Sequence, residues 1–178
     1  FCFRKMVLDG SIFSHIGITL FETIVSFLIV TIIGISAAVL LWSSRSASEI
    51  LEPYLVMLNS LPKSALAPML IVWMGSHVHT IIAAAVSVAV FGSILTLHTG
   101  FLSMDPDKIR LIYALGGSKK DVLTKVLLPG SVPLILSNMK VNVGLCLVGV
   151  IIGEFLAARR GLGYLIIYGS QVFSCVYI

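Results

Sequence analysis

The sequence predicts an all-α membrane protein, a bundle of helices that crosses the bilayer several times. Of its 178 residues, 58% are hydrophobic and only 11% are charged, and the mean hydropathy is +1.07. Soluble domains carry about 25% charged residues. The apolar residues also gather in runs long enough to span a membrane, with one long polar segment between them. The net charge of +4 suits anionic headgroups, so nucleic acid is not an expected partner.

Four spans follow from the apolar runs, because about 20 apolar residues cross the hydrocarbon core. Residues 23–44 carry no charge and, with the apolar residues before them, predict a span over about 16–42, with Glu22 at headgroup level near its entry. A polar joint over 43–52 follows. Residues 64–104 contain no Asp, Glu, Lys or Arg and are too many for one crossing. They predict spans over about 53–74 and 80–100, separated by a turn at residues 75–79, and a fourth span covers about 132–156.

We expect one transmembrane domain over residues 1–178. We also expect that at least one membrane segment of the protein is missing from the sequence at each end. The chain begins at Phe1 rather than Met and ends at Ile178 inside a rising apolar stretch. The three cysteines have no ligand-like spacing, and the two histidines in the 75–79 turn have no further ligand near them in the sequence. The sequence therefore predicts neither a disulfide nor a metal site.

The chain has twelve basic and eight acidic residues, twenty charged residues in all, and the polar segment Asp105–Pro129 carries eight of these twenty. Asp105 is placed to cap a helix that begins with Pro106 and has an acidic residue in its first turn. Ile109, Ile112 and Tyr113 then share one face of that helix. The segment therefore predicts a first short amphipathic helix outside the membrane.

A second short helix is predicted in the same segment. Gly116-Gly117 permits a sharp turn and the close approach of another backbone. Ser118 is placed to cap a helix with Val122 and Val126 on one face, and Pro129 is expected to end it. We call residues 103–131, which contain both helices, the polar loop.

The spacing within the polar loop resembles the cytoplasmic loop of the permease subunits of bacterial ABC importers. That loop reads E-A-A, three residues, Gly, nine residues, Ile-x-Leu-Pro. Gly116 stands thirteen residues before Pro129, as the pattern requires, and Val126 and Leu128 take the Ile and Leu places. The E-A-A triplet is replaced by Arg-Leu-Ile at 110–112, which removes the acidic residue.

Further blocks, in the same order along the chain, resemble the nitrate, sulfonate and taurine branch of these permeases. They are residues 53–68 followed by 71–75, Val132-Pro133 with Lys140, and Gly153-Glu154 followed by 161–165. The resemblance implies the fold of a type I importer permease. It also implies a bacterial cell-membrane location, a second permease copy, two ATPase chains and an extracytoplasmic binding protein. The chain has no G-x-x-x-x-G-K-[ST] phosphate loop, so we expect ATP on the partner and no enzyme activity or cofactor here.

In such importers the polar loop docks on the ATPase. The residues to which we assign this role are Asp105, Ile109, Arg110, Ile112, Tyr113, Gly116, Gly117, Ser118, Val122, Val126, Leu128 and Pro129. The alternative is a helix that only lies on the bilayer surface, favoured by its lysines, in a secondary transporter or another membrane protein.

A second set of residues is a candidate for the solute pathway or its gate. Prolines within a span free carbonyl groups that need partners in neighbouring helices or in a water-filled path, although a kinked packing helix fits the second span equally well. Lys140 is an intramembrane charge that either acts inside the bundle or extends to the headgroups, and Glu154 either belongs to the gate or is an interfacial carboxylate. The set comprises Asn59, Pro62, Lys63, Pro68, Lys140 and Glu154.

The basic residues predict the orientation. Six of them, Arg45 and the five in the polar loop, lie on one side, and four lie on the other, at positions 4, 5, 159 and 160. Because cytoplasmic loops are richer in Lys and Arg, we expect the polar loop inside the cell, with His77, Arg159 and Arg160 outside.

Overall fold

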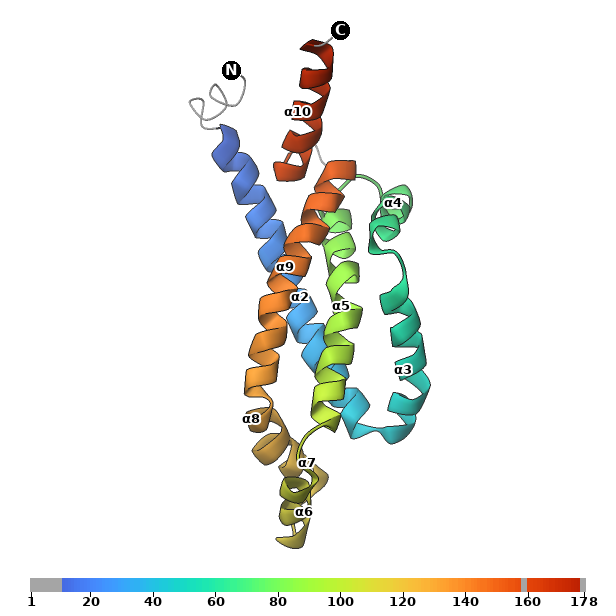
Figure 1. Cartoon of the computed structure of the whole chain (residues 1–178), viewed down its shortest axis with the longest axis vertical. Coiled ribbons are helices and arrows are strands. Elements are labelled where there is room, and N and C mark those ends of the chain that lie inside the picture. The colour runs from blue at the N-terminus through green and yellow to red at the C-terminus, as the bar shows by residue number, and fades with distance from the viewer. Residues whose placement is uncertain (1–10, 158–159, 177–178) are drawn as a thin grey trace. The chain divides into compact units, whose positions relative to one another are not determined.

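The computed structural model describes residues 11–157 and 160–176, and within these residues it contains helices and no strands. The predicted all-α class is therefore confirmed. Figure 1 shows the helices in chain order. Their bounds are α2 Ser11–Ser43, α3 Arg45–Ser60, α4 Lys63–Met74, α5 Val78–Leu102, α6 Pro106–Ala114, α7 Lys119–Val122, the π-helical η1 Leu123–Leu127, α8 Leu128–Gly130, α9 Val132–Ala157 and α10 Leu162–Val176.

Three of the described helices, α2, α5 and α9, are long and apolar enough to cross a membrane, and a fourth span is present if the bent pair α3–α4 counts as one. These three cover the predicted first, third and fourth spans and extend each of them at one or both ends. The turn between α4 and α5 lies where the sequence predicts it. Gly75 adopts a φ of 78°, which suits glycine, and its carbonyl accepts a hydrogen bond of 2.7 Å from the Thr80 hydroxyl.

The helices over the expected second span begin before its predicted start and are broken within it. The predicted polar joint at 43–52 is helical from Arg45 onwards, and the helix α3 runs through Pro53 to Ser60. The chain then breaks at Leu61 and Pro62, and α4 begins at Lys63. Proline has no N–H group and restricts the residue before it, which favours a helix boundary there. Of the two prolines expected to break this span, Pro62 does so, whereas Pro68 lies inside α4.

The chain contacts divide into two compact units. One unit comprises Thr31–Ser60 and Phe91–Val141 and includes the polar loop. Its core is formed by the buried residues Ala38, Leu97, Phe101 and Leu127. Small residues bring the helices of this unit together: a Cβ on Gly34 of α2 would lie 2.7 Å from the Ser93 hydroxyl oxygen of α5. Such close approach at small residues is typical of helices packed in membranes.

The other unit comprises Phe1–Val30, Leu61–Val90 and Asn142–Ile178. Its buried apolar cluster is Ile81, Ala85 and Val150. A Cβ on Gly149 of α9 would lie 2.7 Å from the Ala85 Cα of α5, so only glycine permits this contact between the two backbones.

Candidate functional site

The polar loop begins with the predicted cap. The Asp105 side chain accepts a hydrogen bond of 3.0 Å from the Asp107 N–H, and Pro106 occupies the first turn of α6. The four N–H groups at a helix start have no partner within the helix, so an Asp at this place stabilises the start of α6. The start of α6 is thus set by local sequence, as expected.

The Gly116-Gly117 turn ends α6 with a Schellman motif. The Gly116 N–H donates to the Tyr113 carbonyl at 3.0 Å, and the Gly117 N–H donates to the Ile112 carbonyl at 2.9 Å. Gly116 has a φ of 77°, and a Cβ built on it would meet no atom within 4 Å. A Cβ on Gly117 would lie 2.9 Å from the Ile112 carbonyl oxygen. Glycine is therefore favoured at position 116 by the positive φ, and at position 117 because a side chain would come too close to the Ile112 carbonyl oxygen.

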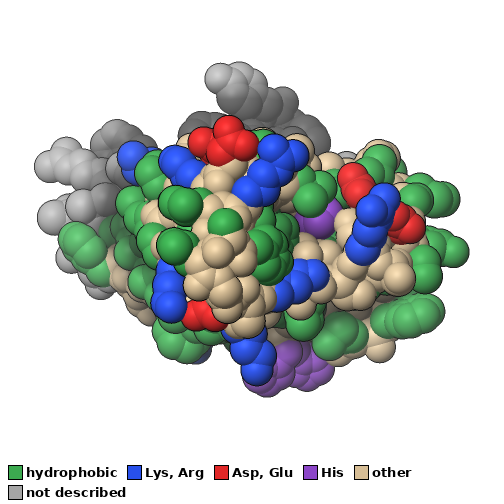
Figure 2. All heavy atoms as spheres, turned by 90° about the horizontal axis from the view of Figure 1, so that it is seen from below, with side chains coloured by type: hydrophobic (Ala, Val, Ile, Leu, Met, Phe, Trp, Pro, Cys, Tyr) green, Lys and Arg blue, Asp and Glu red, His purple; other side chains and the backbone are tan. Residues whose placement is uncertain are grey.

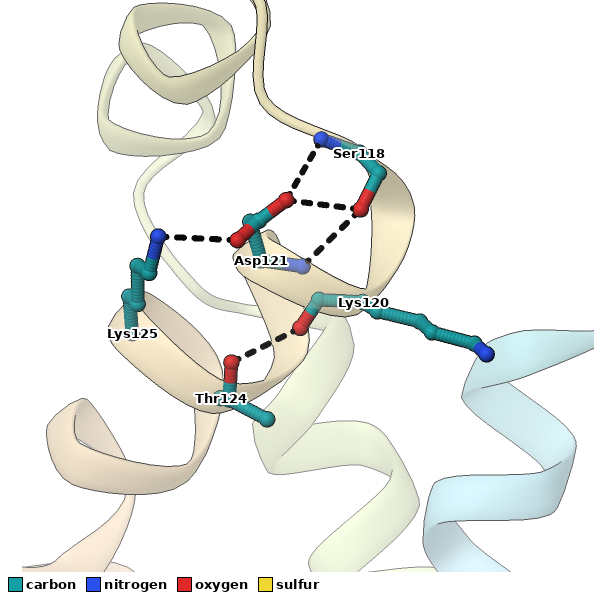
Figure 3. A network of polar contacts seen from close by, with 5 residues as sticks. All are labelled: Ser118, Lys120, Asp121, Thr124 and Lys125. Carbon is teal, nitrogen blue, oxygen red and sulfur yellow. Dashed lines mark hydrogen bonds and ion pairs between the residues drawn. The ribbon is translucent and has the colours of Figure 1, made fainter.

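The second helix starts with a capping box, shown in Figure 3. The Asp121 N–H donates to the Ser118 hydroxyl oxygen at 3.4 Å, and the Asp121 carboxylate accepts from the Ser118 N–H at 2.9 Å. Lys125 adds an ion pair of 2.8 Å to the same carboxylate. The hydrogen bonds from Lys125 and from Ser118 hold the pKa of the Asp121 carboxyl well below its usual range. The sequence analysis predicted the Ser118 cap but not its Asp121 partner, which the spacing S-x-x-D indicates.

The prediction that Pro129 ends the second helix is wrong. The chain passes from α7 into the π-helical η1, where the Leu128 N–H donates to the Leu123 carbonyl, and then into α8, which contains Pro129. A proline in the first turn of a helical segment loses no hydrogen bond, because that turn's N–H groups have no partner within the segment. The wider π turn therefore lets the helical path continue through Gly130.

The two halves of the polar loop differ in burial. No residue of α6 is buried, and Leu111, Tyr113 and Leu115 are 59%, 48% and 76% exposed. In the second half Val122 and Leu127 are fully buried. Figure 2, which views the molecule from below, shows basic and acidic side chains with hydrophobic side chains among them.

The predicted docking residues also differ in burial, in both halves of the polar loop. Val122 is packed inside the unit, so its side chain offers no surface to a partner in this structure. Ile109, Ile112, Gly117, Val126 and Leu128 are half-buried. The exposed members of the set are Asp105, Arg110, Tyr113, Gly116, Ser118 and Pro129. The sequence analysis did not select Leu111 and Leu115, which the structure leaves exposed beside them.

The predicted pathway residues lie on three helices, α3, α4 and α9, and in the break between the first two. Asn59 is half-buried at the end of α3, and its side-chain oxygen has no hydrogen-bond partner among the described residues. Pro68 and Lys140 are exposed, on α4 and α9 respectively. The side chain of Lys63 lies outside the described part of the chain.

Glu154 is not the interfacial carboxylate that the sequence suggests, because it is fully buried. One carboxylate oxygen accepts a hydrogen bond of 2.6 Å from the Thr19 hydroxyl, and the other accepts 2.8 Å from the Gly163 N–H at the start of α10. A Cβ on Gly161 would collide with this carboxylate. The Gly-Glu and Gly-Leu-Gly motifs therefore form one structural unit, in which a carboxylate compensates the free N–H groups of a helix start.

Glu22 was also expected at the headgroups, and the structure instead buries it beside Glu154, leaving 1% exposed. It lines a cavity of about 550 Å³ together with His77 and Arg160. The buried carboxyl groups thus belong to the packing of α2, α9 and α10 within their unit.

Comparison with known proteins gives relatives of one kind. An aliphatic sulfonates transport permease protein, SsuC of Bacillus subtilis, is 26% identical over 95% of this chain and 61% of its own length. The formylaminopyrimidine transport permease protein ThiX of Halalkalibacterium halodurans is 26% identical over 88% and 62%, respectively. The taurine transport system permease protein TauC of Escherichia coli is 26% identical over 89% and 58%. The chain spans about three fifths of the length of these relatives.

A solved chain of the MetNI methionine ABC transporter, in an inward-facing conformation, has the same fold. The TM-score is 0.78 at 20% identity, and the match covers 95% of this chain and 83% of the solved one. Residues 30–174 match the family described as "Binding-protein-dependent transport system inner membrane component". This match includes the polar loop and three long apolar helices in whole or in part. The chain is therefore a multi-pass membrane protein that belongs to the family of binding-protein-dependent transport system inner membrane components.

Proposed function

We propose that this chain is part of the permease subunit of an ATP-driven importer in a bacterial cell membrane. It would form the solute path with a second copy and dock through the polar loop on an ATPase. The observation that carries the proposal is the first half of the polar loop, a capped helix with no buried residue and three exposed large apolar side chains. Exposed apolar groups outside the membrane indicate a protein partner.

The rigid turn after α6 supports docking rather than a helix that lies on the bilayer. A surface helix needs one continuous apolar face towards the lipid, whereas α6 stops in the Schellman turn after nine residues. The open space beside Gly116 leaves room for the backbone of another chain to approach. The relatives named for sulfonates, formylaminopyrimidine and taurine support a small organic solute as cargo, delivered by an extracytoplasmic binding protein.

We further propose that ATP is bound and hydrolysed by the partner ATPase and that the chain itself catalyses no reaction. Closure of two ATPase chains would move the two polar loops and switch the helices between outward- and inward-facing states. The polar loop would then lie in the cytoplasm, in agreement with the excess of basic residues there.

The test is reconstitution of the full-length permease in proteoliposomes with the ATPase and binding protein encoded beside it. We expect no ATP hydrolysis by the permease alone, and hydrolysis that rises with the loaded binding protein when all components are present. A variant in which Leu111 and Leu115, two exposed apolar residues of the polar loop, are both changed to Ser should not form the complex. A complex that still forms with this variant would contradict docking through this surface. Hydrolysis by the purified permease alone would contradict the assignment of ATP to the partner.

A further inference from the structure

Lys119 joins the polar loop to the end of a membrane span. Its ammonium group donates a hydrogen bond of 2.7 Å to the carbonyl oxygen of Ser43, the last residue of α2, which lies 76 positions earlier in the chain. The last carbonyl groups of a helix have no partner within the helix and lie at the negative end of its dipole. A lysine is therefore a favourable partner for the end of α2.

The same ammonium group also lies over the ring of Trp42, 5.5 Å from its centroid. This is within the range of a cation–π contact. Trp42 in turn packs against the buried cluster of Ala38, Leu97, Phe101 and Leu127. Lys119 thus contacts a residue, Trp42, that is itself packed against the core of its unit.

The position of Lys119 in the loop is fixed on its own side as well. It is the first residue of α7 and follows the capping-box residue Ser118 directly. Val122, one turn later, is fully buried. Lys119 therefore stands between the exposed half of the polar loop, which ends in the Gly116-Gly117 turn, and the end of α2.

The neighbouring lysine provides a matched comparison. The Lys120 backbone carbonyl accepts a hydrogen bond of 2.9 Å from the Thr124 hydroxyl, but its ammonium group makes no hydrogen bond or ion pair within the described part of the chain. Figure 3 shows its side chain extended away from Asp121. The two lysines have the same charge and adjacent positions, and among the described polar contacts a hydrogen bond to α2 is made by Lys119 and not by Lys120.

We propose that Lys119 is a positioning residue that carries movement of the polar loop to α2 through the Ser43 carbonyl and the Trp42 ring. This inference rests on the proposed function, since it assumes an ATPase that moves the loop. Chains of packed side chains and hydrogen bonds can carry coupling between distant sites. The Lys119 hydrogen bond joins the start of α7, in the polar loop, to the end of α2.

The experiment follows two sites at once in the full complex of permease, ATPase and binding protein. An environment-sensitive fluorophore is attached to a cysteine at Lys108, which is exposed on α6 and is not one of the proposed docking residues, or at Leu40, which is 66% exposed near the end of α2. ATP and vanadate trap the closed ATPase, and the emission shift at each site is measured. In the unchanged complex we expect shifts at both sites.

Lys119→Met should leave the shift at position 108 unchanged and reduce the shift at position 40 by about fivefold, an effect of the size that single residues on a coupling route show. Lys119→Arg, which keeps the charge and donors, should restore most of it, and Lys120→Met should change neither site. An undiminished Leu40 shift in Lys119→Met would overturn the inference. If that variant does not assemble, Trp42→Leu serves instead, and an undiminished shift there has the same consequence. Absence of a shift at position 108 in the complex without the Lys119 substitution would refute docking and so the proposed function.

Discussion

The two halves of the polar loop have similar composition and opposite roles in packing. In the first half α6 buries none of its residues, and Leu111, Tyr113 and the C-cap residue Leu115 are exposed. In the second half α7 and η1 bury Val122 and Leu127, and Lys119 contacts the end of α2. Both halves are short, capped and outside the spans.

This difference teaches that adjacent turns of one motif can differ completely in burial. The Gly116-Gly117 turn separates a half with exposed apolar side chains from a half that is packed on the core of its unit. Under the proposed function, we expect substitutions of apolar residues in the first half to affect binding of the ATPase and substitutions in the second half to affect folding. The following predictions test that division.

The largest effect is expected from Leu127→Asp in the attached half. Leu127 is fully buried against Ala38, Leu97 and Phe101, so a carboxylate there would be desolvated without a partner. Truncation of such a residue to Ala alone costs about 2–5 kcal/mol. We expect the Asp variant to be lost from the membrane fraction on quantitative immunoblots, while Leu115→Asp accumulates normally. Equal amounts of the two variants would refute the division.

The next effect concerns Gly116→Asp in the turn itself. The open space around Gly116 accommodates a side chain, and Asp tolerates positive φ better than most residues. We therefore expect normal insertion but loss of ATPase stimulation by the loaded binding protein, because the side chain blocks close docking. Gly117→Ala is the control, since its Cβ meets the Ile112 carbonyl and disturbs α6 internally. Normal stimulation by Gly116→Asp would indicate that the turn does not meet the ATPase.

Labelling with a membrane-impermeant maleimide sharpens the comparison by measuring the exposure of each half directly. Cysteines placed singly at Leu115 and at Leu127, with the three native cysteines changed to Ser, differ in exposure between 76% and 0%. We expect labelling at 115 to exceed that at 127 by about tenfold or more, since a local opening of about 1.4 kcal/mol already reduces reactivity tenfold. The reagent should reach 115 in inside-out vesicles only. Labelling of 115 on intact cells would reverse the predicted orientation.

The smallest effect is expected at the capping box. Ser118→Ala should cost about 1 kcal/mol of local stability, seen as faster amide hydrogen exchange in α7 but not in α6. The lowered pKa of Asp121 means that its carboxylate stabilises the folded loop above about pH 4, and that this contribution is lost as pH falls towards the lowered value. Asp121→Asn should remove this pH dependence. Equal acceleration of exchange in α6 would show that the halves are not independent.

Much of the polar loop could be predicted from sequence because its determinants are local. The Asp105 cap, the Gly116-Gly117 turn and the Ser118 cap each depend on residues within five positions of one another, and each is found as predicted. The same holds for the long apolar helices, since hydropathy over about 20 residues suffices to identify a span. The helix break at Pro62 was predicted from one residue, but the helix through the polar joint before it was not.

The sequence by itself thus determined the class of protein, the long spans and the start of each loop helix, because hydropathy and capping act between near neighbours. Only the tertiary structure decided what each polar or apolar residue faces. It placed Glu154 in a buried contact with Thr19, 135 positions away, and Lys119 on Ser43, and it buried Val122 while leaving Leu115 exposed. Such partners are brought together by the packing of helices, in which a shift of one residue would rotate a side chain by about 100° to another face.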